Sequence, residues 1–258
     1  MKNKKKNMLD LLMISLVIFG LFKSILKDVG TLEIPEQIEE TCQDDEVCVI
    51  KKNKTVKKWF DYTYDRFKVY NKDIDTSTVK LFIKVAEKYG FTKDSTQYRL
   101  VVGQILLESG ANQNWYKGHP YEGQLVVSYA GAVGRTQILP STAYYFMDKI
   151  LSDKDIETFK SFGASDFSFA KNDKLSKSRK IQLAKDWLSD SENNIIMWGY
   201  IMRYNMSKTG NNIIKSLIAY NAGRGGLNIF MKNGNSIWKH EYVKGIYNRL
   251  ARVDKKVS

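Results

Sequence analysis

Proline, cysteine and histidine are scarce in this sequence, which has three, two and two of them among 258 residues. So few prolines, with apolar residues recurring at helical spacing, predict a mainly α-helical fold. Sustained strand-like alternation is missing, although a short β-hairpin is allowed within residues 118–130. Cys42 and Cys48 alone cannot make a metal site, and with only His119 and His240 besides them we do not expect a zinc centre. We therefore expect neither a metal nor a cofactor.

Long apolar runs are missing except near the N-terminus. There the uncharged segment Leu11 to Phe22 follows a cluster of four lysines. This run is shorter than the roughly 20 residues of a typical membrane helix, and neither a small-x-small cleavage site nor a lipobox cysteine follows it. We expect residues 1–28 to be an uncleaved signal anchor with its basic end in the cytoplasm. A cleaved signal peptide and an ordinary buried helix are the alternatives.

An acidic stretch separates this segment from the rest of the chain. Seven carboxylates fall within residues 33–46 and predict a solvated linker, which we place at residues 29–54. Cys42 and Cys48 lie there, and in an exported protein they would either close a small disulfide loop or stay unpaired. Helical spacing of apolar residues begins near Thr55, so the folded domain is expected to span residues 55–258.

The charge is strongly and unevenly positive. The net charge is +13, and residues 195–258 hold eleven Lys or Arg against two acidic side chains. A basic surface attracts polyanions, but no zinc finger, helix-turn-helix or RNA-binding aromatic motif accompanies it. We expect an anionic wall or membrane surface as partner, and no nucleic acid. A solvated basic face without any partner fits the composition equally well.

The apolar run from Tyr98 to Gly110 predicts a helix, with Ser95 or Thr96 as its N-cap and Gly110 just past its end. Val101 and Glu108 are seven positions apart, so the Glu108 carboxylate lies on the stripe that faces the core. Partial desolvation and the negative end of the helix dipole both disfavour its charged form. Such a carboxyl group can stay protonated near neutral pH and act as a general acid. The alternative is a glutamate at a frayed helix end, turned to water.

Further motifs follow Glu108 in a characteristic order and resemble those of lytic transglycosylases of the soluble, goose-lysozyme-like type. The resemblance covers roughly residues 76–250. The motifs are Glu108-Ser109, Gly131-Ala-x-Gly134-x-x-Gln137-x-x-Pro140-x-Thr142-Ala143, Asp190-x-x-x-Asn194-Ile195-x-x-x-Gly199-Tyr200, Ala219-Tyr220-Asn221-Ala222-Gly223 and Glu241-Tyr-Val243. The chain departs from the family pattern in a longer connection between Glu108 and Gly131, in Arg135-Thr136 where Leu-Met is common, and in Arg224 where Pro is common.

The resemblance implies a lysozyme-like α-helical domain that cleaves peptidoglycan glycan strands. Glu108 would be the single catalytic acid and base, acting between N-acetylmuramic acid and N-acetylglucosamine and leaving 1,6-anhydro ends. The family positions expected to bind substrate are Ser109, Gly131, Gly134, Gln137, Tyr220 and Asn221. Each of these also has a structural alternative: a capping serine, turn glycines, a structural hydrogen bond or helix packing.

Two other functions remain open. A hydrolytic goose-type muramidase would need a second polar group to hold water, and the candidates are Glu122, Asp186, Asp190 and Glu192. Asp190 is expected to be an N-cap and Asp186 to lie at the surface, which leaves Glu122 as the one that can reach the cleft. The other alternative is a non-catalytic wall-binding module of an envelope machine. The biological setting, bacterial or phage, is left open by the sequence.

Overall fold

The computed structural model describes the backbone of residues 45–257 and the side chains of residues 57–257. The expected signal anchor, Cys42, the side chain of Cys48 and most of the acidic linker lie outside the described residues. Within the described part, no helix has both the length and the apolar character needed to cross a bilayer.

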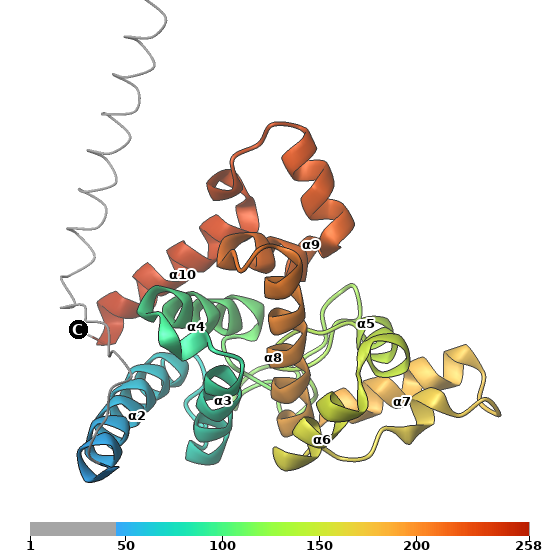
Figure 1. Ribbon diagram of the computed structural model, residues 1–258, viewed down its shortest axis with the longest axis horizontal. Helices are drawn as coiled ribbons and strands as arrows, with labels where there is room; N and C mark the ends of the chain where they lie inside the picture. The colour runs from blue at the N-terminus through green and yellow to red at the C-terminus, as the bar shows by residue number, and fades with distance from the viewer. Residues whose placement is uncertain (1–44, 258) are drawn as a thin grey trace, which may run out of the picture. The chain divides into compact units, whose positions relative to one another are not determined.

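The described chain is mainly α-helical, as predicted (Figure 1). It also contains short helical turns at Phe91–Lys93 (η1), Phe146–Ile150 (η2), Ser168–Lys171 (η3) and Ile237–Lys239 (η4). The α-helices are α2 (Asp45–Lys68), α3 (Thr76–Lys88), α4 (Ser95–Ser109), α5 (Pro140–Tyr145), α6 (Asp153–Ser161), α7 (Lys177–Ser189), α8 (Ser191–Lys208), α9 (Ile213–Lys232) and α10 (Glu241–Val257).

Helix α2 begins at Asp45, earlier than the domain start expected near Thr55. The last part of the expected linker is therefore helical. Two physical effects account for this extension. Helices propagate easily once a turn has formed, and acidic residues such as Asp45 and Glu46 are favourable at a helix N-terminus.

Helices α4 and α10 pack closely against each other, and this contact joins the C-terminal helix to the helix that carries Glu108. A Cβ atom at Gly103 of α4 would come within 2.6 Å of Leu250 Cγ, so only glycine permits this approach of the two helices. Val101 and Ile105 are fully buried on the same helix, as the helical spacing predicted. The buried stripe of α10 consists of Val243, Ile246, Leu250 and Val253.

Asp254 links α10 to α2 and α4 through two ion pairs. Arg66 Nη2 lies 2.7 Å from Asp254 Oδ1, and Arg99 Nη2 lies 3.0 Å from Asp254 Oδ2. All three side chains are largely shielded from solvent, which makes such pairs stronger than exposed ones. The register of α10 against α4 is thereby fixed at the end opposite to Tyr242.

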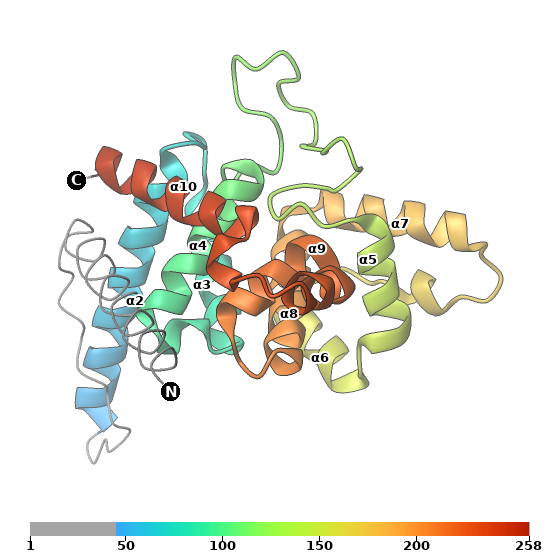
Figure 2. The ribbon, with the colours of Figure 1, turned by 90° about the horizontal axis from the view of Figure 1, so that it is seen from above.

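The long connection between α4 and α5 projects as a loop from the helical body (Figure 2). The expected β-hairpin is not formed as strands within the described residues. Isolated antiparallel bridges occur instead, at Asn114–Leu125, Val127–Val133 and Val133–Ile138. The tip has aromatic packing of its own, because the Trp115 and His119 rings stack with centroids 4.0 Å apart. Without a neighbouring sheet, the two sides of the loop have no partner that would extend the bridges into strands.

Candidate active site

Glu108 lies in the last turn of α4, and its side chain is only partly exposed. The N-cap of this helix is Asp94, not Ser95 or Thr96, since the Asp94 carboxylate accepts a hydrogen bond from Gln97 N at 2.9 Å. Gly110 ends the helix in the left-handed conformation, with φ of 65°, as predicted. The position of Glu108 at a helix C-terminus is therefore well defined.

Of two tyrosines from distant helices, one contacts this carboxyl group and the other lies near it. Tyr242, in the first turn of α10, donates a hydrogen bond from its phenol to Glu108 Oε1. Tyr220, on α9, donates to the backbone oxygen of Thr136 at 2.8 Å and lies close enough for the charge of Glu108 to affect its pKa. Helices α4, α9 and α10 thus each supply one side chain to the site.

The surroundings of Glu108 favour its neutral form. Burial raises the pKa of Glu108 from 4.5 to about 7, although the hydrogen bond from Tyr242 opposes part of this rise. Burial, followed by the neighbouring charge of Glu108, raises the pKa of both Tyr220 and Tyr242 well above 10. The two phenols therefore remain protonated donors. A carboxyl group with a pKa near neutrality can both release and accept a proton at physiological pH.

The loop that carries Thr136 is held by buried amide side chains. Asn194, on α8, accepts hydrogen bonds from Thr136 N at 2.9 Å and Thr136 Oγ1 at 2.7 Å, and donates to Val133 O at 3.0 Å. Gln113 accepts from Arg135 N at 2.9 Å and donates to Ser189 O at 2.9 Å. These contacts fix the carbonyl that Tyr220 uses. They tie the loop to α8 and to the end of α7.

Three of the predicted substrate-binding residues have internal roles in this loop. Ser109 Oγ donates to Arg135 O at 2.6 Å. Gly134 has φ of 72°, and a Cβ atom there would meet Gln113 Nε2 at 2.6 Å, so a side chain is excluded. The Gly134 amide donates to Val126 O at 2.7 Å, and the Gly131 amide donates to Ser128 O at 2.9 Å. Both amides are therefore already used inside the protein.

Gln137 and Asn221 offer groups to a ligand. Gln137 Nε2 donates to Gly134 O at 2.7 Å, while its Oε1 atom has no hydrogen-bond partner among the described residues. Asn221 follows Tyr220 on α9, and its side chain is exposed. Both side chains can therefore bind acetamido or hydroxyl groups without losing an internal contact.

Arg135, one of the departures from the family pattern, is buried with 4% of its surface exposed. Its Nε and Nη1 atoms have no hydrogen-bond partner. Burial lowers the pKa of Arg135 to about 10, although the charge of Asp75 opposes this shift. Asp75 is the N-cap of α3, where its carboxylate accepts from Thr78 N. The Arg135 guanidinium is thus a desolvated charge that forms no ion pair with any side chain the structure describes, although Asp75 acts on it from a longer distance.

Of the other carboxylates considered from the sequence, Glu192 is exposed in the first turn of α8, and the remaining three have partners away from Glu108. Glu122 Oε2 accepts from Gly118 N at 2.8 Å, within its own turn. Asp190 caps α8 by accepting from Glu192 N and Asn193 N, both at 2.9 Å, as predicted. Asp186 is exposed, also as predicted, and accepts from Gln182 Nε2 at 3.0 Å. Among the residues that the structure describes, no group of three His, Cys, Asp or Glu side chains could hold a metal ion.

Tyr242, Asn194 and Gln113 are the residues whose roles the sequence did not predict. Tyr242 and Glu108 lie 134 positions apart in the chain, and no local pattern reports such a contact. Tyr242 and Asn194 did lie within motifs that carry the family resemblance. A tyrosine at the start of a strongly amphipathic helix was the only local signal for Tyr242.

Residues 168–240 match the family model of the transglycosylase SLT domain. This match confirms the resemblance to lytic transglycosylases of the soluble, goose-lysozyme-like type, and the helical fold agrees with it. The matched segment includes Asn194, Tyr220 and Asn221, whereas Glu108 precedes it and Tyr242 follows it. No curated protein and no solved structure matches the chain.

Proposed function

We propose that this protein is a peptidoglycan lytic transglycosylase in which Glu108 serves as both general acid and general base. Its substrate is the β-1,4 bond between N-acetylmuramic acid and N-acetylglucosamine. The observation that carries the proposal is the partly buried Glu108 carboxyl group, bonded to Tyr242 and flanked by Tyr220. The match of residues 168–240 to the transglycosylase SLT domain supports this enzyme class, while the role of Glu108, which precedes the matched segment, is part of the proposal.

In the first step, protonated Glu108 gives its proton to the oxygen that bridges the two sugars. The bond from C1 of the muramyl residue to this oxygen breaks, and positive charge develops at C1. The Glu108 carboxylate that results is stabilised by the hydrogen bond from Tyr242. Because the phenol of Tyr242 stays protonated, this donor is in place when the negative charge appears.

In the second step, the Glu108 carboxylate takes the proton of the muramyl 6-hydroxyl group, whose oxygen bonds to C1. This closes a 1,6-anhydro ring and returns Glu108 to its protonated form, so no water is consumed. The attacking hydroxyl belongs to the same sugar, and proximity therefore replaces a second carboxylate. A pKa of about 7 lets one group perform both transfers.

Gln137 and Asn221 are proposed to contact the sugars directly, through the Gln137 Oε1 atom and the exposed Asn221 amide. Ser109 and Gly134 are proposed to act by shaping the loop that supports Tyr220. Gly131 has open space around its Cα atom and would allow a sugar to approach the backbone.

A hydrolytic muramidase is the nearest alternative. It requires a polar group that activates water, and Glu122 was the best candidate from the sequence. Its carboxylate binds Gly118 N in its own turn, which favours the transglycosylase.

A non-catalytic wall-binding module is disfavoured for a different reason. Glu108 is costly to ionise in its position, and a binding protein gains nothing from that cost.

The test replaces Glu108 by Gln, which is nearly isosteric and cannot deliver a proton. Release of soluble products from purified peptidoglycan should fall by roughly 10⁴-fold or more, since general acid–base catalysis contributes about 10²–10⁴-fold and one residue plays both parts. Glu122→Gln makes the same chemical change in the projecting loop and serves as the matched control. Unchanged activity of that variant supports the transglycosylase, whereas its inactivation would favour the hydrolase. If Glu108→Gln keeps more than a few per cent of the wild-type rate, Glu108 is not the acid.

We further propose that the N-terminal segment anchors the enzyme in the membrane, with the helical domain exported to the periplasm or the outer face of the cytoplasmic membrane. The lysine cluster and the apolar run that follows it support this proposal. Full-length protein should sediment with membranes, while a chain that starts at Asp45 should not. Mature protein recovered free of membranes, with its N-terminus beyond residue 28, would contradict the anchor.

A further inference from the structure

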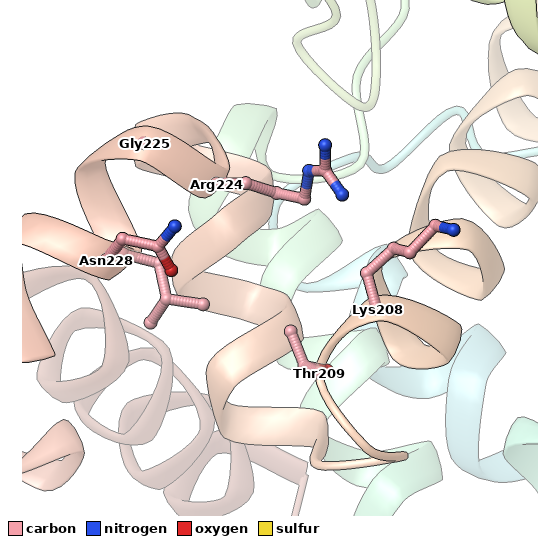
Figure 3. A pocket seen from close by; sticks show the side chains of 6 residues that line it. Lys208, Thr209, Arg224, Gly225 and Asn228 are labelled. Carbon is pink, nitrogen blue, oxygen red and sulfur yellow. The ribbon is translucent and has the colours of Figure 1, made fainter.

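A polar cavity that is not lined by Glu108 lies where the end of α8 meets the middle of α9 (Figure 3). Its volume is about 320 Å³, which is at the lower end of the range for small-ligand sites. A bare ion would leave most of this space unfilled. The lining residues are Lys208, Thr209, Arg224, Gly225, Leu227 and Asn228.

The cavity exists because α9 is kinked. Gly223 has φ of 70° and ψ of 164°, so the second part of α9 starts in a new direction directly after it. A residue with a side chain would be strained in this conformation. The kink turns Arg224 toward the end of α8, and Figure 3 shows Arg224 and Lys208 on two sides of the same space.

Two positive charges gather at this cavity without a counter-ion. The Arg224 guanidinium lies 5.7 Å and the Lys208 ammonium 5.4 Å from the centre of the same Tyr204 ring. Neither cation forms an ion pair within the part of the chain that the structure describes. Like charges held close together favour a bound anion, since an anion relieves their repulsion.

The remaining lining adds apolar and polar contacts. Leu227 is buried at the cavity wall and offers apolar surface, whereas Asn228 is exposed and offers an amide. A ligand that fits this lining carries an acidic group together with small apolar groups, as a short acidic peptide does. This combination separates a peptide from a simple inorganic anion.

The cavity lies close to the site on α9 that faces Glu108. Arg224 follows Tyr220 by four positions, with the non-helical Gly223 between them, so their Cα atoms are at most about 14 Å apart. Arg224 also stands where the family commonly has proline, so this positive charge is a feature of this chain. A peptide of several residues, attached to a sugar near Glu108, is long enough to span such a distance.

We propose that Arg224 and Lys208 bind a carboxylate of the stem peptide that the glycan substrate carries. This inference rests on the proposed function for its substrate class. It adds a peptide subsite to the glycan groove, so strands with acidic stems would bind more tightly than bare glycan.

The test is equilibrium binding, in which every protein carries Glu108→Gln so that the glycans are not cleaved; wild type refers here to the cavity residues. Titration calorimetry would compare the wild-type full chain with the double variant Arg224→Gln, Lys208→Gln on three glycan tetrasaccharides: one with free stem carboxylates, one with these carboxylates amidated, and one without stems. For the wild type, the dissociation constant of the first should be about 10-fold lower than those of the other two. The double variant should bind all three equally. Both substituted side chains are exposed, so folding should be preserved.

The matched control is Lys232→Gln, Lys255→Gln, which removes the same charge from exposed positions outside the cavity. This control should keep the wild-type preference. The proposal is overturned if wild-type protein binds the three glycans equally or not at all, or if the control loses the preference as fully as the double variant does. A separate digestion of peptidoglycan by wild-type protein tests the proposed function independently of the peptide subsite. If anhydro products are absent, the proposed function is contradicted, while the binding preference for acidic stems can still be measured.

Discussion

The raised pKa of Glu108 makes a quantitative prediction about stability. In the folded protein this pKa is about 7, compared with 4.5 for an unperturbed glutamate. The folded state therefore binds more protons than the unfolded state between these two values, and the free energy of unfolding falls as the pH rises through this window. The difference between the two pKa values corresponds to about 3 kcal/mol of unfolding free energy, since each tenfold change in proton affinity is worth about 1.4 kcal/mol.

Glu108→Gln removes this dependence, because glutamine does not titrate. The stability of the variant relative to the wild type should therefore increase by about 3 kcal/mol between pH 4.5 and pH 8. Urea unfolding of both proteins at several pH values measures this difference. Glu122→Gln, which changes an exposed carboxylate, should show no comparable trend. If the stability difference between the variant and the wild type stays constant with pH, the pKa of Glu108 is not raised in the folded protein. If the wild type instead gains stability relative to the variant as the pH rises, this pKa is lowered and the prediction is wrong.

Three further substitutions test other parts of the site. Tyr242→Phe removes a hydrogen bond that lowers the pKa of Glu108, so the alkaline limb of the activity profile should move to higher pH; an unchanged profile would contradict the contact. Arg135→Met removes a buried guanidinium whose Nε and Nη1 lack partners, and urea unfolding should show a gain of about 1–3 kcal/mol, whereas a loss would reveal a missed partner. Asn194→Ala leaves Thr136 N buried without its partner and leaves Val133 O with only the longer bond from Ile138 N at 3.3 Å, so it should cost about 3 kcal/mol together with much of the activity. Full activity in that variant would show that the loop does not need this support.

Local patterns predicted the parts of this fold that depend on local physics. The helical stripe that includes Val101 and Ile105 is buried, Gly110 ends α4, and Asp190 caps α8. Each depends on residues within one or two turns of the chain. The N-cap of α4 was misplaced because Asp94, Ser95 and Thr96 are all good caps, and only the backbone conformation decides between them.

Contacts between distant segments were not predictable in the same way. The hydrogen bond between Tyr242 and Glu108 depends on how α10 packs against α4, and Gly103 permits that packing. The internal use of the Gly134 amide likewise depends on how the long connection folds back on itself. The kink of α9 at Gly223 lies inside a motif that the family resemblance had marked, but the cavity it creates also needs Lys208 from another helix.

Mass analysis of the products released from purified peptidoglycan tests the central claim most directly. Wild-type protein should release muropeptides with 1,6-anhydromuramyl ends, which are lighter by one water molecule than the products of hydrolysis. Glu108→Gln should release none. Muropeptides with reducing ends would show that water attacks C1 and that the enzyme is a hydrolase. No release by the wild type would contradict the proposed activity altogether.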